Sequence, residues 1–234
     1  MSKRFKGEQC VYCSTKPSVA GDHIFARQFF LESDRANLPQ APICKECNDE
    51  KSRLEHYLTV LLPFGGRHRQ AVENLTSMVP KRLQRNVKLH RQLAESKLDH
   101  AIPLEGDKLE ELFALIARGL IWYHWRVYLN DEQHAIHTAM LTPKGIRLYD
   151  ELLFTREARD RVNVSVGGDT FRYEGLQGTD DPALTGWRFF IYGGLTVSEG
   201  DAGEPLAAQM VVVTGPRSLV QKFDQFTHKR VRHV

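Results

Sequence analysis

The sequence predicts an α+β protein built from a small cysteine-stapled N-terminal unit, central helices and a C-terminal region that contains an antiparallel sheet. Three observations lead to this prediction. All four cysteines of the 234-residue chain fall within its first 47 residues. Apolar residues recur at helical spacing in the middle of the chain, and alternating patterns with paired glycines begin after about residue 160. The expected boundaries are 1–66, 67–130 and 131–234.

The composition is typical of a globular protein without a membrane-spanning segment. Hydrophobic residues make up 41% and charged residues 26%, which excludes wholesale disorder. No apolar run approaches the roughly 20 residues of a membrane span. The basic start, Met1 to Lys6, is not followed by the apolar stretch of a secretory signal. We therefore expect a cytoplasmic protein.

The first two helical predictions come from leucine spacing and from proline. The first 50 residues are rich in turn formers and hold too few apolar residues for a core of their own. A unit of this kind needs an additional cross-link, such as a bound metal ion, to stabilise it. Residues 48–63 predict a helix that Pro63 and the glycines after it end. Its apolar positions are Leu54, Leu58, Leu61 and Leu62. Residues 67–100 predict helix with a break near Pro80.

The strongest helix prediction covers residues 107–129, after a boundary marked by Pro103 and Gly106. One broad apolar face predicts that this helix packs against the core. That face consists of Leu109, Leu112, Phe113, Ile116, Leu120, Tyr123 and Val127.

Strand patterns dominate the last third of the chain. Residues 162–166 alternate and lead into Gly167-Gly168, which predicts a hairpin. Residues 187–192, two glycines and residues 195–197 predict a second hairpin, and residues 209–214 a buried strand. A closing helix is expected over 217–227. No motif assigns chemistry to 131–234, which could set target choice, bind a regulatory ligand or protein, or form a homodimer.

The cysteines form two Cys-x-x-Cys pairs, and each pair has the same two-residue spacer. Four thiolates suit tetrahedral Zn²⁺, and a closed four-sulfur site is structural because it keeps no open position. Buried free thiols are the alternative. A redox pair is disfavoured because no strand leads into a helix at the first cysteine. The predicted structural zinc ligands are Cys10, Cys13, Cys44 and Cys47.

Between and directly after the cysteine pairs lie residues suited to a second kind of site. Asp22 and Asn48 carry oxygen donors of the type that Mg²⁺ prefers. His23 carries an imidazole that can take a proton from water near pH 7. On an extended strand His23 would point away from Asp22, unless a turn or bulge redirects it.

The order Cys-x-x-Cys, Asp-His-Ile, Cys-x-x-Cys-Asn-x-x-Lys resembles the zinc-stapled subgroup of the HNH endonucleases, over roughly residues 8–60. The resemblance implies a ββα-metal module in which a β-hairpin carries Asp22-His23 and the following helix carries Asn48. Asp22 and Asn48 would then hold a catalytic divalent ion, Mg²⁺ or another. His23 would be the general base, and Lys51 would lie near the substrate phosphate.

The implied reaction is one-metal hydrolysis of DNA phosphodiesters, leaving 5′-phosphate and 3′-hydroxyl ends; RNA stays open as a substrate. Two features depart from the family pattern. The last histidine of the family name has no clear counterpart: His56, about 80° around the helix from Asn48, could be a third ligand, a phosphate contact or plain surface. Glu55 is a rival for the ligand role. Phe25 and Ala26 stand where a proline often follows the Asp-His-Ile pattern.

Positive charge is concentrated in the first half of the chain. Residues 1–100 hold 17 Lys/Arg and 11 Asp/Glu, a balance of +6, although the whole chain carries only +3. The stretch 67–97 adds eight Lys/Arg to two glutamates, so phosphate contacts are slightly favoured over a solvated helical face. The alternative functions are a non-catalytic zinc-dependent DNA-binding protein and, less favoured, a zinc-stapled protein–protein adaptor.

Overall fold

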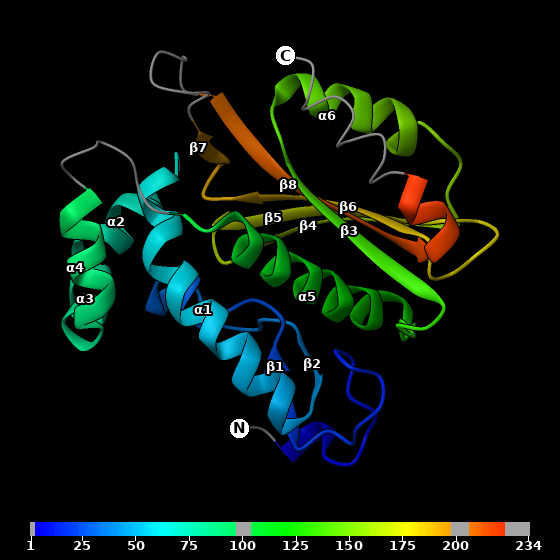
Figure 1. Cartoon of the computed structure of the whole chain (residues 1–234), viewed down its shortest axis with the longest axis horizontal. Helices are drawn as coiled ribbons and strands as arrows, with labels where there is room; N and C mark the ends of the chain where they lie inside the picture. Colours follow the sequence, from blue (N-terminus) through cyan, green and yellow to red (C-terminus); the bar gives the residue numbers. More distant parts are fainter. Residues whose placement is uncertain (1–2, 97–103, 198–205, 223–234) are drawn as a thin grey trace.

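The structure is a computed structural model that describes residues 3–96, 104–197 and 206–222. Figure 1 shows a β-sheet covered on one face by a long helix, with the N-terminal hairpin and its helix packed beyond that helix. The predicted α+β class is confirmed. Within the described ranges, no helix combines the length and the apolar character needed to cross a membrane.

The N-terminal unit consists of a two-stranded hairpin followed by a helix. Strands β1 (Ala20–His23) and β2 (Gln40–Ile43) pair antiparallel, with Asp22 opposite Ala41. Helix α1 (Lys45–Gly65) begins directly after β2. The leucines that predicted this helix are buried. Pro63 has no N–H to donate to the carbonyl of Thr59, and Arg82 donates to that carbonyl instead, at 2.7 Å. A short 3-10 turn, Lys3–Phe5, packs beside the hairpin.

The predicted helical stretch after α1 is broken twice. Helices α2 (Arg69–Ser77), α3 (Val79–Arg85) and α4 (Val87–Ser96) form one corner of the molecule (Figure 1). The expected break at Pro80 is confirmed, since Pro80 lies in the first turn of α3. The second break comes from Asn86, whose side-chain oxygen accepts a hydrogen bond from the amide of Leu89 at 3.1 Å and so begins a new helix.

Helix α5 (Gly106–Trp125) confirms the strongest prediction but ends four residues early. Arg126 takes a left-handed conformation, φ 57°, which ends the helix. Tyr123, assigned to the apolar face, is 41% exposed, while Val127 lies in the following loop. The other five predicted face positions are buried.

The C-terminal sheet has the order β3-β8-β6-β5-β4, with β7 beside β8, and every pair is antiparallel. Helix α6 (Pro143–Tyr149) and the π-helical turn that follows it, Asp150–Phe154, connect β3 to β4. Sequence analysis did not identify β3 or α6. The strands are β3 (His134–Leu141), β4 (Asp160–Val166), β5 (Phe171–Gln177), β6 (Thr185–Ile191), β7 (Leu195–Val197) and β8 (Leu206–Pro216).

One of the two predicted hairpins is correct. β4 and β5 pair across Gly167-Gly168 as expected. The second is wrong, because β6 pairs with β5 and β8 while β7 pairs with β8. β8 lies between the two strands that were expected to pair, and Leu195 forms a bridge with Gly66 at the end of α1. The expected buried strand is part of β8. Residues 217–222 are helical, and the rest of the expected closing helix lies outside the described residues.

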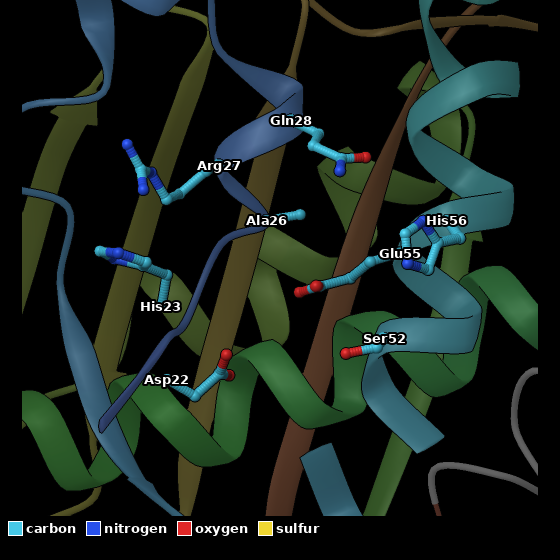
Figure 2. Close-up of a pocket in the computed structure, with 8 residues that line it drawn as sticks. All are labelled: Asp22, His23, Ala26, Arg27, Gln28, Ser52, Glu55 and His56. Carbon is cyan, nitrogen blue, oxygen red and sulfur yellow. The ribbon is translucent and has the colours of Figure 1, made fainter. Parts of the chain in front are cut away.

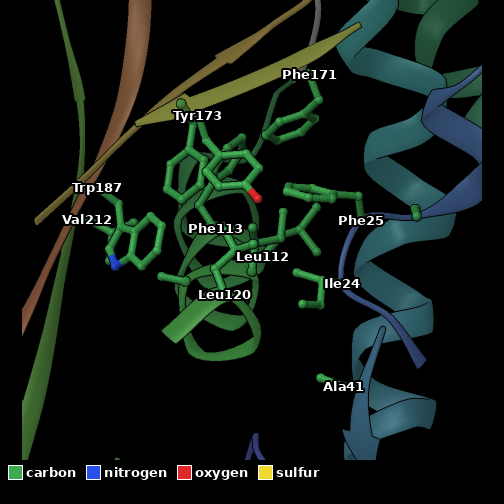
Figure 3. Packing of buried hydrophobic residues seen from close by; sticks show 14 of the residues in the cluster. Ile24, Phe25, Ala41, Leu112, Phe113, Leu120, Phe171, Tyr173, Trp187 and Val212 are labelled. Carbon is green, nitrogen blue, oxygen red and sulfur yellow. The ribbon is translucent and has the colours of Figure 1, made fainter. Parts of the chain in front are cut away.

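The largest hydrophobic cluster among the described residues joins all three parts of the chain (Figure 3). Phe25, fully buried after β1, lies 4.4 Å from Phe171 of the sheet between ring centroids. Ile24 packs against α5 at Gly119, where a Cβ would lie 2.9 Å from Ile24 Cγ1. Glycine at that position therefore allows the residues after His23 to approach the helix closely. On the other face, Ile146 and Tyr149 of α6 cover β8.

Acidification is expected to destabilise the fold partly through His124. Its ring nitrogen Nε2 lies 3.0 Å from the Tyr173 hydroxyl, and burial lowers the His124 pKa, with Asp160 opposing the shift. Because the folded-state pKa is below the ordinary 6.5, this stability is complete above pH 6.5 and declines as the pH falls toward the folded value. Denaturant melts of wild type and His124→Gln from pH 7.5 to 5 should show a weaker pH dependence in the variant. Equal slopes would contradict the assignment.

Candidate metal centre and the adjoining cavity

The four cysteines form one cluster at the start of α1. Their Sγ atoms all lie within 4.8 Å of one another, and the Sγ atoms of Cys13 and Cys44 are 3.9 Å apart. Tetrahedral zinc with Zn–S bonds of about 2.3 Å requires sulfur–sulfur distances of about 3.8 Å. Ser14 turns the chain after the first pair with φ 54°. The cluster therefore fits the predicted four-thiolate metal site.

Without a bound cation the thiols of the cluster do not all ionise at pH 7. Burial raises the pKa of Cys44 to about 11, and burial together with the Cys44 sulfur raises the pKa of Cys47 further. At Cys13 burial also acts upward, but hydrogen bonds from Thr15 and the amide of Lys16 outweigh it and lower the pKa to about 6. A divalent cation stabilises all four thiolates together, whereas without one their mutual repulsion opposes ionisation.

A cavity of about 230 Å³ lies between the end of β1 and one face of α1. Ser52, Glu55 and His56 line it from the helix, since residues three and four apart share a face. Figure 2 shows the carboxylates of Asp22 and Glu55 and the hydroxyl of Ser52 pointing toward one another. The remaining lining residues are His23, Ala26, Arg27 and Gln28.

Lys51 is a buried cation behind this cavity. Its side chain is 2% exposed, and its ammonium lies 2.8 Å from Asp22 Oδ2, forms an ion pair with Glu55 and donates to the carbonyl of His23 at 2.8 Å. Burial alone would lower the pKa of Lys51, but Asp22 and Glu55 raise it above the usual value. This position differs from the expected contact with a substrate phosphate, because the ammonium faces three partners inside the protein.

The two carboxylates share the one ammonium. Tyr12, between the first two cysteines, also donates a hydrogen bond to Asp22 Oδ2, at 3.3 Å. Burial raises the pKa of Glu55; Lys51 opposes this shift and Asp22 adds to it. With both carboxylates ionised the group carries a net charge of −1, which attracts a further cation toward the cavity.

His23 lies at the edge of the cavity and points to the other side of the strand from Asp22, near Arg27 (Figure 2). The strand geometry expected from sequence is thus observed without a bulge. The Gln40 side-chain amide lies 3.4 Å from His23 Nε2. Burial and the charge of Arg27 lower the pKa of His23, while Asp22 acts in the opposite direction. At pH 7 the imidazole is therefore neutral, the form that can accept a proton.

The structure brings together some of the predicted site residues. Asp22, His23, Glu55 and His56 line one cavity, and His56 is exposed. Asn48 is half-buried in the first turn of α1, one turn before Ser52. It is not one of the described residues that line the cavity. The sequence did not identify four residues that take part in the site: Ser52, Arg27, Gln28 and Tyr12. The helical spacing from Asn48 could have indicated Ser52.

The basic stretch divides into exposed and internal cations. Arg82 is an internal one: its guanidinium donates to the carbonyls of Thr59 at 2.7 Å and Gln28 at 2.6 Å, so it joins α3 to α1 and to the loop after β1. Lys97 lies outside the described residues. The exposed side chains can reach a phosphate from solvent, as expected from the sequence. They are Arg67, Arg69, Lys81, Arg85, Lys88 and Arg91.

Replacing Lys51 with methionine is expected to destabilise the protein by about 3 kcal/mol. The change leaves the Asp22 and Glu55 carboxylates inside the protein without their cation, and breaking a buried ion pair costs about 3–5 kcal/mol. Lys45→Met is the matched control, since Lys45 makes an exposed ion pair with Asp49 on the same helix. Urea denaturation should separate the two variants; equal stability would show that the triad contributes nothing.

Comparisons with known proteins found no matching family model, no matching characterised protein and no matching solved structure. The residues and geometry described above are therefore the basis for assigning a function. Two features point to chemistry: a four-cysteine cluster suited to a metal ion, and a cavity lined by carboxylates, a hydroxyl and imidazoles.

Proposed function

We propose that the protein is a metal-dependent endonuclease of the HNH type that hydrolyses DNA phosphodiester bonds. The observation that supports this most strongly is the cavity in which Asp22 and Glu55 face Ser52 with His23 at the edge. The proposal is also supported by the order β1, β2, α1 and by the four-cysteine cluster, because the family resemblance implies a hairpin, a following helix and a zinc site. Zinc at the cluster would be structural and would fix the hairpin against the helix.

The donor set of the cavity suits a hard divalent cation such as Mg²⁺. Asp22 and Glu55 supply carboxylate oxygens, and Ser52 supplies a hydroxyl. Asn48, one turn away along α1, would need to turn toward the cavity to join them, so Glu55 is the better-placed second ligand. When bound, the cation would neutralise the negative charge that develops on the phosphate and its leaving oxygen.

The protein's own groups supply the remaining chemistry. His23 is neutral at pH 7, so in this proposal it takes the proton from the attacking water. Arg27 is exposed beside His23 and would hold the phosphate by charge-assisted hydrogen bonds. Lys51 keeps Asp22 and Glu55 in place from behind. The exposed cations of α2, α3 and α4 extend the positive surface for the DNA backbone.

The direct test is incubation of supercoiled plasmid with purified protein, with and without added Mg²⁺ or Mn²⁺. Nicked or linear product is expected only with the added cation, and Asp22→Asn should reduce it by about 10²-fold or more, because a neutral amide binds the cation more weakly than a carboxylate. Omitting the cation is preferable to adding a chelator, which would also remove zinc. Absence of nicking under every cation and salt condition would contradict the proposal.

A non-catalytic zinc-dependent DNA-binding protein is the second candidate, and one contact favours it. The Lys51 ammonium already lies 2.8 Å from Asp22 Oδ2, where it supplies part of the positive charge that a divalent ion would bring. In this second candidate function, Asp22 and Glu55 only neutralise the buried Lys51 and bind no divalent ion. The plasmid experiment separates the two candidates, since this one predicts salt-dependent DNA binding with intact plasmid at every cation concentration.

A further inference from the structure

His23 lies between two cavities. His23 lines the cavity that contains Asp22 and Glu55, and it also lines a second cavity of about 400 Å³. This volume falls within the range of about 300–1,000 Å³ that is usual for pockets that bind small ligands. The second cavity is bounded by the N-terminal 3-10 turn, the start of β2 and the C-terminal end of α5. Its lining residues are Arg4, Phe5, His23, Asn37, Leu38, Pro39, Gln40, Trp122, Tyr123 and Arg126.

The two cavities differ in the charges that line them. The first is lined by two carboxylates and Arg27, whereas the described residues that line the second include two arginines and no acidic residue. Both arginines rest on aromatic rings: the Arg126 guanidinium lies 4.1 Å from the Trp122 ring centroid, and that of Arg4 lies 5.0 Å from the ring of Phe5. Such stacking holds a planar guanidinium in place, so that its edge can bind an anion such as phosphate.

The second cavity also offers aromatic surface. Tyr123 is 41% exposed although it belongs to the last turn of a helix whose apolar side is otherwise buried. Trp122 beside it is buried under Arg126. Aromatic rings beside cationic groups are the pattern by which proteins hold unpaired bases, since every base has a face that stacks and a phosphate that carries charge.

We propose that the second cavity holds an unpaired nucleotide of the strand that is cut, with its base against Tyr123 and its phosphate at Arg126 and Arg4. This inference rests on the proposed nuclease function for the place of the scissile bond. The shared position of His23 sets the order: the scissile phosphate lies by the carboxylate cavity, and the neighbouring nucleotide enters the arginine cavity. A base paired within a duplex is stacked and cannot enter, so the site selects single-stranded or locally opened nucleic acid.

Fluorescence anisotropy tests the site without cleavage. The probes are a fluorescein-labelled single-stranded DNA of mixed sequence, about 12 nucleotides long, and its duplex; the full-length protein is used with no added divalent cation. The single strand should bind more tightly. Arg126→Gly and Tyr123→Ala should each weaken its binding roughly tenfold. Glycine is chosen at 126 because the left-handed φ of 57° accepts it without strain.

The matched control is Arg147→Gln, which removes an exposed arginine from α6, away from both cavities. Its binding should change less than twofold, and Arg126→Lys should fall between Arg126→Gly and wild type because it keeps charge but loses the planar stack. Wild-type affinity in both cavity variants, equal loss in Arg147→Gln, equal binding of single strand and duplex, or no binding by the wild type would each overturn the inference. A protein that shows the expected binding pattern but never nicks plasmid would refute the nuclease function and leave the nucleotide site intact.

Discussion

The proposed nuclease function predicts that replacing His23 with alanine lowers the rate of metal-dependent DNA cleavage by about 10²–10⁴-fold, the usual contribution of a positioned general base. The expected effect is confined to the reaction. His23 is half-buried at the end of β1, and its neighbours Ile24 and Phe25, not its own ring, hold this segment in the core. The variant should therefore keep its circular dichroism spectrum and its zinc content.

The measurement is plasmid nicking over time at saturating Mg²⁺ or Mn²⁺. His90→Ala is the matched control, because His90 is exposed on α4 and belongs to neither cavity. It should cleave at the wild-type rate. If His23→Ala loses zinc or unfolds, His23 has a structural role, and if it cleaves as the wild type does, another group activates the water.

Replacing Cys44 with serine is expected to abolish metal binding at the four-cysteine cluster and to lower the free energy of unfolding by several kcal/mol. Zinc binding to four-ligand sites contributes about 10–16 kcal/mol of apparent free energy in small domains. Here the loss is smaller, since part of the N-terminal unit is held by the common core. The thiol of Cys44 is buried at the start of α1, so its loss also loosens the junction between β2 and the helix.

Metal content by elemental analysis, together with thermal denaturation, tests this prediction. Lys16→Ala is a suitable control: it breaks an exposed ion pair between the two cysteine loops, with Glu46 at 3.0 Å, and leaves every sulfur in place. It should retain one zinc per chain and melt close to the wild type. A Cys44→Ser protein with a full complement of zinc and an unchanged melting temperature would show that the cluster does not hold the metal.

Sequence patterns predicted those parts of the fold that local chemistry determines. The cysteine spacing led to the cluster, leucine spacing to α1, and paired glycines to the β4–β5 turn. The β6–β7 pairing failed because β8, which follows both strands in the chain, pairs with each of them, and a distant partner leaves no local signal. Phe25 could be identified as a departure from the family pattern, but its packing on Phe171 depends on tertiary structure.

The candidate site was predictable in its residue types more than in its contacts. The Asp22-His23 pair lies at the end of a strand in a hairpin, as the family resemblance implied. The role of Lys51 was not predictable, because its spacing from Glu55 on the helix does not reveal that Asp22 closes the same buried triad from another element. The cavity beside Trp122 and Arg126 depends on α5 ending at Trp125, and the sequence predicted a longer helix.

The burial of Ile24 and Phe25 against α5 and β5 determines how this molecule can be divided. A fragment that stops at residue 66 would present both side chains to water and would tend to aggregate, so the hairpin cannot be transplanted to another protein without the surfaces that cover it. The same two residues follow His23 directly in the chain. The position of the imidazole therefore depends on the contacts that Ile24 makes with α5 and Phe25 makes with β5.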